Sequence, residues 1–193
     1  MASPEEVLSF WLDEYGPQDW YRSDADFDAL VRDRFEATWQ AAMQGKFALW
    51  LTYPSGALAY CILLDQFPRN MFRGTKKAFS SDRYALAAAK QAIHRGWDLK
   101  IDEPARALFY MPLVHSENLC DQDRAVRLMK ERLPNGPVYL LHAKAHREII
   151  RMFGRFPSRN EALSRTTSKP ESAFAESGGY GSVLRALQAT EAA

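Results

Sequence analysis

The sequence predicts an all-α fold of seven to nine helices, arranged as a stack of helical hairpins. Helix-start signals recur along the 193 residues, and apolar side chains follow them at three- and four-residue spacing. No segment of four or more residues alternates cleanly between apolar and polar side chains, so we expect no sheet. Hydrophobic residues make up 47% of the chain and charged residues 25%, a balance that excludes a disordered protein.

Two amphipathic helices are expected at the amino-terminal end. Residues 3–6, Ser-Pro-Glu-Glu, combine an N-cap serine, a first-turn proline and a capping-box glutamate, and this helix stops at 15–17. The second helix starts near Asp24 or Asp26, because a carboxylate is favourable at a helix N-terminus, and it ends by Gly45. Its apolar residues recur every four positions, at Phe27, Val31, Phe35, Trp39 and Met43.

A helix that is apolar on most sides follows in the middle of the chain. It begins at Pro54, and we expect Phe67 and Pro68 to close it, since a proline interrupts helical hydrogen bonding. Residues 67–80 are then predicted to form a loop rich in Arg, Asn and Gly. Residues 47–53 fit either a turn of helix or an extended stretch, and the pattern does not separate the two.

The remaining helices are placed by the same start and stop signals. Asp102 opens a helix that Pro112 is expected to kink or to end near Met111. The others are an alanine-rich helix at 82–95 capped by Ser81, one from 121 or 123 to 133, and those at 138–153 and 168–178. The last of these opens with a capping box formed by Ser168 and Glu171. Successive helix pairs take about 34 to 40 residues, which resembles a tetratricopeptide-like superhelix in its proportions. No linker divides the chain, so residues 1–193 are predicted to form a single domain.

Charge and cysteine content exclude several classes of partner. The 25 Lys and Arg nearly balance the 24 Asp and Glu, which argues against nucleic-acid or anionic-membrane binding driven by net charge. Cys61 and Cys120 lack the spacing of a disulfide framework and favour a reducing compartment. The chain starts with acidic residues, unlike a signal peptide, and no apolar run reaches about 18 residues. We therefore expect a cytoplasmic protein with no nucleic-acid partner, no membrane partner and no cofactor.

Two segments place several polar side chains beside a Phe-Pro pair. The first contains Asp65, Arg69, Asn70 and Arg73, and the second contains Arg155, Arg159 and Asn160. Because proline fixes the direction in which the chain leaves a helix, each Arg-Asn pair is expected on a stiff corner. Arginine offers a planar fork of donors that suits carboxylate or phosphate, and asparagine adds a donor and an acceptor. If the corners converge with Arg165, they form a cationic pocket. Alternatively, the arginines bind helix-end carbonyls and pair with Asp65, Glu117 or the acidic first helices.

Histidines supply the other candidate groups. His115 and Glu117 follow the proline kink and suit a general base and its partner, whereas Ser116 is a poor nucleophile candidate because neighbouring residues point in different directions. His142 and His146 are four residues apart on one helix face, a spacing that can hold zinc. The glutamate of a zinc-protease motif is absent between them, so we expect hydrogen-bonded histidines and no metal.

The motifs together resemble those of a known family. They are Leu-Asp-Gln-Phe-Pro-Arg-Asn at 64–70, Phe-Arg-Gly at 72–74, His-Ser-Glu at 115–117, and Phe-Gly-Arg-Phe-Pro at 153–157 with Arg-Asn at 159–160. They are similar to signatures of a family of uncharacterised, mainly bacterial proteins that carry a domain of unknown function. The resemblance extends over nearly the whole chain. It implies an all-helical, tetratricopeptide-like fold and implies no activity, so no catalytic residue is carried over.

These observations lead to one leading hypothesis and two alternatives. The leading hypothesis is a binding protein whose polar cleft, formed by both Arg-Asn corners, His146 and residues 115–117, holds a small anionic molecule or a peptide carboxylate. The first alternative is a hydrolase- or lyase-type enzyme in which His115 or His146 is the acid or base and the arginines hold an oxyanion. The second is a helical-repeat adaptor that binds a protein.

The expected absence of a metal is directly testable. Metal analysis of the purified protein should find no stoichiometric zinc, because the third and fourth ligands of a zinc site are missing from the histidine motif. A metal content near one per chain, lost in a His142→Ala, His146→Ala double variant, would show that the histidines are ligands.

Overall fold

The computed structural model describes residues 1–20 and 23–191, and all regular structure in these residues is helical. The elements are α1 (Pro4–Leu8) continued by the π-helix η1 (Ser9–Glu14), α2 (Ala25–Met43), α3 (Pro54–Cys61) continued by the π-helix η3 (Ile62–Gln66) and α4 (Phe67–Met71), α5 (Asp82–His94), α6 (Met111–Val114), α7 (Leu119–Arg132), α8 (Pro137–Phe153), α9 (Lys169–Glu176) and α10 (Gly179–Glu191). Counted as uninterrupted segments, these are nine helices in the described part of the chain, which confirms the predicted all-α class.

Short 3₁₀ segments connect several of these helices. They are η2 (Ala48–Thr52), η4 (Lys76–Phe79), η5 (Asp98–Lys100), η6 (Ala105–Phe109) and η7 (Pro157–Arg159). The stretch at 47–53, which the pattern left open, is therefore mostly a 3₁₀ helix. None of the described helices is both long and apolar enough to cross a membrane.

The chain divides into two compact units, Met1–Pro112 (the first unit) and Leu113–Ala193 (the second unit). The boundary lies within the short helix α6, and the candidate residues of the two Arg-Asn segments fall in different units. A single domain and a tetratricopeptide-like superhelix both stay predictions.

Aromatic side chains fill the core of the first unit. Phe10, Trp11, Phe35 and Phe67 are fully buried, and Phe27 is nearly so. The ring of Phe67 lies 4.4 Å from that of Phe35 and 5.2 Å from that of Trp11, measured between centroids. Such clusters stabilise a fold through both their large apolar area and favourable ring contacts. Through Phe67, the core thus joins α4 to the two amino-terminal helical segments.

Both predicted caps at the amino-terminal end are confirmed. The side chain of Ser3 accepts from the amide of Glu6, whose carboxylate accepts in turn from the amide of Ser3. Asp24 caps α2 by accepting from the amides of Asp26 and Phe27. These side chains satisfy amide groups that a helix leaves without an internal partner.

The predicted helix end at Phe67 and Pro68 is wrong. The helix widens over residues 62–66, where the amide of Phe67 donates to the carbonyl of Ile62, and then continues as α4 with Pro68 in its first turn. A π-helical turn spans five residues per hydrogen bond, so the proline ring meets a wider turn instead of clashing with the carbonyl four residues before it. Residues 67–71, predicted as the start of a loop, are consequently helical.

Three other boundaries differ from the prediction. Residues 105–109 form a 3₁₀ helix, and Pro112 lies in the first turn of α6 instead of ending a helix that starts at Asp102. The helix α7 begins at Leu119, before either predicted start at 121 or 123. The side chain of Asn118 caps it by accepting from the amide of Cys120. The helix α10 follows Gly178 and was not predicted, since the two glycines at 178–179 indicated a stop.

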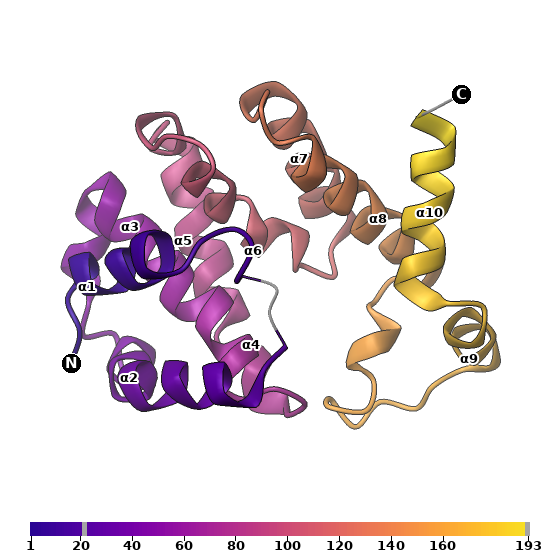
Figure 1. Ribbon diagram of the computed structural model, residues 1–193, viewed down its shortest axis with the longest axis horizontal. Coiled ribbons are helices and arrows are strands. Elements are labelled where there is room, and N and C mark those ends of the chain that lie inside the picture. Colours follow the sequence, from indigo (N-terminus) through magenta and orange to yellow (C-terminus); the bar gives the residue numbers. More distant parts are fainter. Residues whose placement is uncertain (21–22, 192–193) are drawn as a thin grey trace. The chain divides into compact units, whose positions relative to one another are not determined.

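The second unit is built around α8, which lies between α7 and α10 (Figure 1). Ile149, Ile150 and Phe156 form its buried cluster, and partly buried side chains from the last two helices, including Phe174 and Tyr180, pack against it. Gly154 ends α8 with a positive φ of 67°, which a residue without a side chain adopts at little cost. The chain then turns, and Phe156 enters the cluster.

Ser81 provides a test of the packing in the first unit. It stands at the N-cap position of α5, yet its buried hydroxyl accepts from Trp39 Nε1 at 3.0 Å and donates to the Leu64 carbonyl at 2.6 Å instead of capping the helix. Ser81→Ala leaves a buried N–H and a carbonyl without this partner, so we expect a loss of about 1–3 kcal/mol in unfolding free energy. Urea denaturation measures it.

Ser80→Ala is the matched control. This neighbouring hydroxyl is exposed and donates only to the Lys77 carbonyl, so its loss should change the unfolding free energy by less than about 0.5 kcal/mol. Equal losses in the two variants would show that the Trp39–Ser81–Leu64 bridge is not important for stability.

Candidate functional site

The first Arg-Asn segment lies in the first unit and forms part of an ionic network between helices. Arg69 donates to the carboxylate of Asp82 at 3.0 and 3.2 Å and to the carbonyl of Asp65 at 2.6 Å. Its side chain is one-fifth exposed, and the Asp65 carboxylate is buried 3.4 Å away. Arg69 thus connects α4 to the first turn of α5. The predicted stiff corner is wrong here, because residues 67–71 continue a helix.

Asn70 and Arg73 bind a single carboxylate on α2. Asn70 donates to Asp28 Oδ1 at 2.9 Å, and Arg73 donates to both oxygens at 2.6 and 2.8 Å. Burial disfavours the charged form of Asp28, but the bonds from Arg73 and Asn70 outweigh it, so its pKa lies below the usual value. Arg32 adds a bond from Nε to the carbonyl of Met71 at 2.8 Å. These bonds join α2 to α4.

In the second unit, the turn at 115–117 is held by α7. The buried side-chain amide of Gln122 donates to the carbonyls of Val114 and Ser116, each at 2.6 Å. The hydroxyl of Ser116 donates to Asp121 at 2.9 Å, so this serine contributes to the start of α7. These bonds fix the backbone from which His115 and Glu117 extend.

Glu117 connects this turn to the second Arg-Asn segment. Its Oε1 accepts from the amide of Phe156 at 2.9 Å, and both oxygens accept from Arg165 at 2.8 Å. Burial opposes ionisation of Glu117, but the bonds from Arg165 and Phe156 outweigh it and hold its pKa below the usual value. One carboxylate therefore binds two residues that lie 39 and 48 positions further along the chain.

Arg155 forms a second carboxylate clamp. Its guanidinium donates to both oxygens of Glu171 at 2.7 and 2.9 Å and to the carbonyl of Thr166 at 2.8 Å. The carboxylate of Glu171 also accepts from the amide of Ser168 as the predicted capping-box partner. Asn160 is buried next to this loop and donates to the hydroxyl of Thr167 at 3.3 Å. These contacts fold residues 155–171 back on themselves.

Arg159 lies beside the histidines. It donates to the carbonyl of His115 at 2.9 Å, and its guanidinium carbon lies 4.6 Å from the centre of the Phe156 ring. The His146 ring centre lies 5.5 Å from that of Phe156 and 6.2 Å from that of His115. His146 and Arg159 therefore pack against Phe156, and His115 is joined to them through its ring and its carbonyl. We call these four residues the His–Arg cluster.

The environment of His146 keeps it neutral. Its Nδ1 contacts the carbonyl of His142 at 2.8 Å, which assigns the proton to that nitrogen. Burial, followed by the nearby His115 and other cationic groups, lowers its pKa to about 3. Tyr180 of α10 packs against His146 at 5.1 Å between ring centres and hydrogen-bonds His142 Nδ1.

Each unit brings together its own part of the predicted site. His115, Glu117, His146, Arg155, Arg159 and Asn160 all belong to the second unit, whereas Asp65, Arg69, Asn70 and Arg73 belong to the first. Sequence reasoning expected the acids of the first helices, where Asp28 lies, as alternative partners of the arginines. It did not name Asp82 or Glu171 as partners, and it missed Tyr180 in the unpredicted helix α10. The capping box at residues 168–171 was the signal that marked Glu171.

A protein-family model matches most of this chain. The model of a family described as a bacterial protein of unknown function, DUF924, matches residues 7–179. The chain is a member of the DUF924 family. The match confirms the resemblance drawn from the motifs, and it includes both Arg-Asn segments and the turn at 115–117.

A solved structure is similar to this DUF924 chain. It is a protein of unknown function from Agrobacterium tumefaciens, 40% identical, with a TM-score of 0.85 over 90% of this chain and 97% of that one. A comparison with curated proteins finds no match. These likenesses establish the family and the helical fold, and they name no ligand or reaction.

His142 and His146 are the candidate metal ligands of this DUF924 protein. They share a face of α8, as their spacing predicts, and Nδ1 of His142 contacts Tyr180 while Nδ1 of His146 contacts a carbonyl. Across residues 1–20 and 23–191, no three His, Cys, Asp or Glu side chains are placed to hold a metal ion.

Glu117 gives a test of how the site is held together. A carboxylate whose pKa is depressed by folding adds stability above its unfolded-state pKa, near 4.3, and this contribution is lost as pH falls through the folded-state pKa. We expect Glu117→Gln to lower the unfolding free energy by about 1–3 kcal/mol at pH 7, and the difference to shrink as pH falls below about 4.3 towards the folded-state pKa.

The comparison variant is Glu131→Gln. Glu131 is half exposed and lies 3.7 Å from Arg127 in a surface ion pair, so its loss should cost less than about 0.5 kcal/mol at pH 7. Denaturant titrations from pH 3 to 8 compare the two variants. A Glu117 effect that is small or independent of pH would rule out its bonding role.

Proposed function

We propose that this DUF924 protein is a helical binding protein, and that the His–Arg cluster of its second unit holds the carboxylate or phosphate group of a small anionic ligand. The observation that carries the proposal is that Arg159 and His146 share the buried Phe156 ring, with His115 beside His146 and bound to Arg159 through its carbonyl. A guanidinium held over a ring keeps its position and can still donate to an anion. This is the part of the predicted cleft that lies within one unit.

Charge in the second unit supports an anionic ligand. The loop that carries the cluster has three guanidinium groups, on Arg155, Arg159 and Arg165, and they share two carboxylates, on Glu117 and Glu171. The surroundings of the cluster therefore favour negative charge. The low pKa of His146 agrees with this, because burial first and then the cationic neighbours disfavour a further positive charge.

Binding is favoured over the hydrolase or lyase alternative. A catalytic base works best when its pKa lies near the working pH, and the pKa of His146, at about 3, leaves it a weak base at neutral pH. Ser116, the nearest hydroxyl in the turn, is bonded to Asp121. An enzymatic function would therefore depend on His115 alone as the acid or base.

Two arginine variants separate a ligand site from a structural network. Arg159→Met should abolish stabilisation by added anions, because Arg159 belongs to the proposed site. Arg69→Met is the matched control: it should lower Tm, since Arg69 joins α4 to α5 through Asp82, and leave the response to anions intact. Melting curves with phosphate and with citrate, against chloride at equal ionic strength, measure both effects.

The expected shifts are within reach of ordinary thermal measurements. An anion at ten times its Kd stabilises the native state by about 1.4 kcal/mol, which raises Tm by about 3–6 °C for a chain of this length. We expect this rise in the wild type and in Arg69→Met. Equal stabilisation of the wild type and Arg159→Met, or none in either, would overturn the proposed site.

A further inference from the structure

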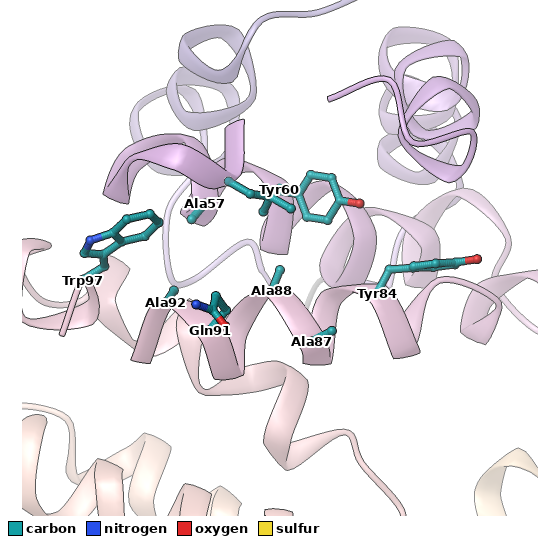
Figure 2. Close-up of a pocket in the computed structure, with 9 residues that line it drawn as sticks. Ala57, Tyr60, Tyr84, Ala87, Ala88, Gln91, Ala92 and Trp97 are labelled. Atoms are coloured by element: carbon teal, nitrogen blue, oxygen red, sulfur yellow. The ribbon is translucent and has the colours of Figure 1, made fainter. Parts of the chain in front are cut away.

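An apolar groove of about 240 Å³ lies between α3 and α5 in the first unit (Figure 2). Ala57 and Tyr60 of α3 form one side, and the alanines of α5 form the other. Tyr84 and Trp97 lie at its two ends. Its full lining is Leu51, Ala57, Tyr60, Tyr84, Ala87, Ala88, Gln91, Ala92 and Trp97.

The groove has the size and chemistry to accept a large apolar side chain. An apolar cavity of about 150 Å³ holds a benzene molecule, so 240 Å³ leaves room for a leucine or an aromatic ring. Small alanines give the depth, because Ala88 and Ala92 lie one turn apart on α5 and face Ala57 across the groove. The two tyrosine hydroxyls, the Gln91 amide and the indole N–H of Trp97 are the polar groups of its lining side chains.

Arginines flank the groove at both ends. The guanidinium carbon of Arg83 lies 4.5 Å from the centre of the Tyr84 ring, and that of Arg95 lies 4.7 Å from the centre of the Trp97 ring. Both arginines are exposed. These ring contacts hold each guanidinium beside the groove. Arg83 Nη2 donates to the Tyr84 hydroxyl and Arg95 Nη1 donates to the Leu51 carbonyl at 3.5 Å, so a carboxylate would bind the other edge of each guanidinium.

A further basic residue on α5 strengthens this positive character. Lys90 lies on α5 between the two arginines. The carboxylate of Asp82 is bound by Arg69, and that of Asp98 is fully buried and accepts from Tyr110 at 2.6 Å. The segments that line the groove, α3 and η2, carry no charged residue. The rim of the groove is therefore cationic around an apolar centre.

We infer that the α3–α5 groove binds an acidic peptide segment of a partner protein, which inserts one large apolar side chain between Tyr84 and Trp97. Carboxylates on either side of that side chain pair with Arg83 and Arg95, which are twelve residues apart in sequence, or about 18 Å along a helix. Apolar burial gives the affinity and the flanking charges select the partner. This inference does not rest on the proposed anion site, which belongs to the other unit.

A labelled peptide tests the inference directly. The probe is a fluorescein-labelled Asp-Glu-Asp-Leu-Phe-Asp-Glu-Asp, followed by fluorescence anisotropy with the full chain carrying Arg159→Met, so that the anion site does not contribute. We expect a Kd between about 1 and 100 μM that weakens as salt is added. Absence of binding at about 1 mM protein would overturn the inference.

Two further peptides separate the apolar from the charged contribution. Replacing Leu-Phe by Ser-Ser should weaken binding at least tenfold, because the groove then stays unfilled. Replacing the acidic residues by lysines should abolish binding, because the rim repels them. Equal binding of the Ser-Ser peptide would show attraction to surface charge only, and equal binding of the lysine peptide would exclude the arginine contacts.

Protein variants place the binding in the groove. Ala87→Trp fills the groove from its exposed edge, and Tyr84→Ala removes one end. Each variant should raise the Kd for the peptide at least fivefold, and its circular dichroism spectrum should stay unchanged. Arg83→Glu with Arg95→Glu should weaken peptide binding at least tenfold. Arg127→Glu with Lys130→Glu, an equal change in charge on exposed residues of the second unit, should not.

The same variants identify other occupants. Wild-type affinity in both groove variants would overturn the inference. Concentration-dependent self-association that Ala87→Trp abolishes, with no peptide bound, would assign the groove to a second copy of the chain. Binding of indole but not of the peptide, again lost in Ala87→Trp, would assign it to a small aromatic ligand and would also overturn the peptide proposal.

Discussion

The carboxylate of Glu117 determines where the functional side chains of the second unit lie. It binds the backbone of Phe156 and the guanidinium of Arg165, so the turn at 115–117 and the loop after α8 cannot move independently. Because Phe156 is thereby fixed, so is the ring against which Arg159 and His146 pack. A partly buried carboxylate needs hydrogen-bonding and charged partners to offset its lost hydration. The partners of Glu117 come from distant positions in the sequence, so its pairing brings those positions together.

The two Phe-Pro segments show why similar sequences gave different local structures. After Phe153, Gly154 takes a left-handed conformation and ends the helix, so Phe156 and Pro157 lie outside it. Two residues before Phe67 the corresponding position is Asp65 instead of a glycine, and the helix there widens and continues. A proline indicates a disturbance in the helical hydrogen bonds, and its neighbours decide whether the disturbance is a stop or a wider turn.

Local signals in the sequence were sufficient for much of the fold and for less of the site. The caps at Ser3, Asp24 and Ser168 depend on side chains within three residues of the amides they bind, and these were predicted. The pairing of Arg73 with Asp28 spans 45 residues, and no periodicity contains it. The sequence shows that an arginine can bind an anion. Whether a carboxylate of the same chain already binds that arginine depends on the tertiary packing.

The widened turn at residues 62–66 also sets the rotational phase of everything that follows it in the same helix. A π-helical turn contains an additional residue, and each residue of a helix turns its successors by about 100°. Removing one residue here would restore regular α-helical bonding and would rotate Asn70 and Arg73 away from α2, although no contact residue had been replaced. The number of residues in this helix is thus itself a structural determinant, one that an inventory of side chains does not record.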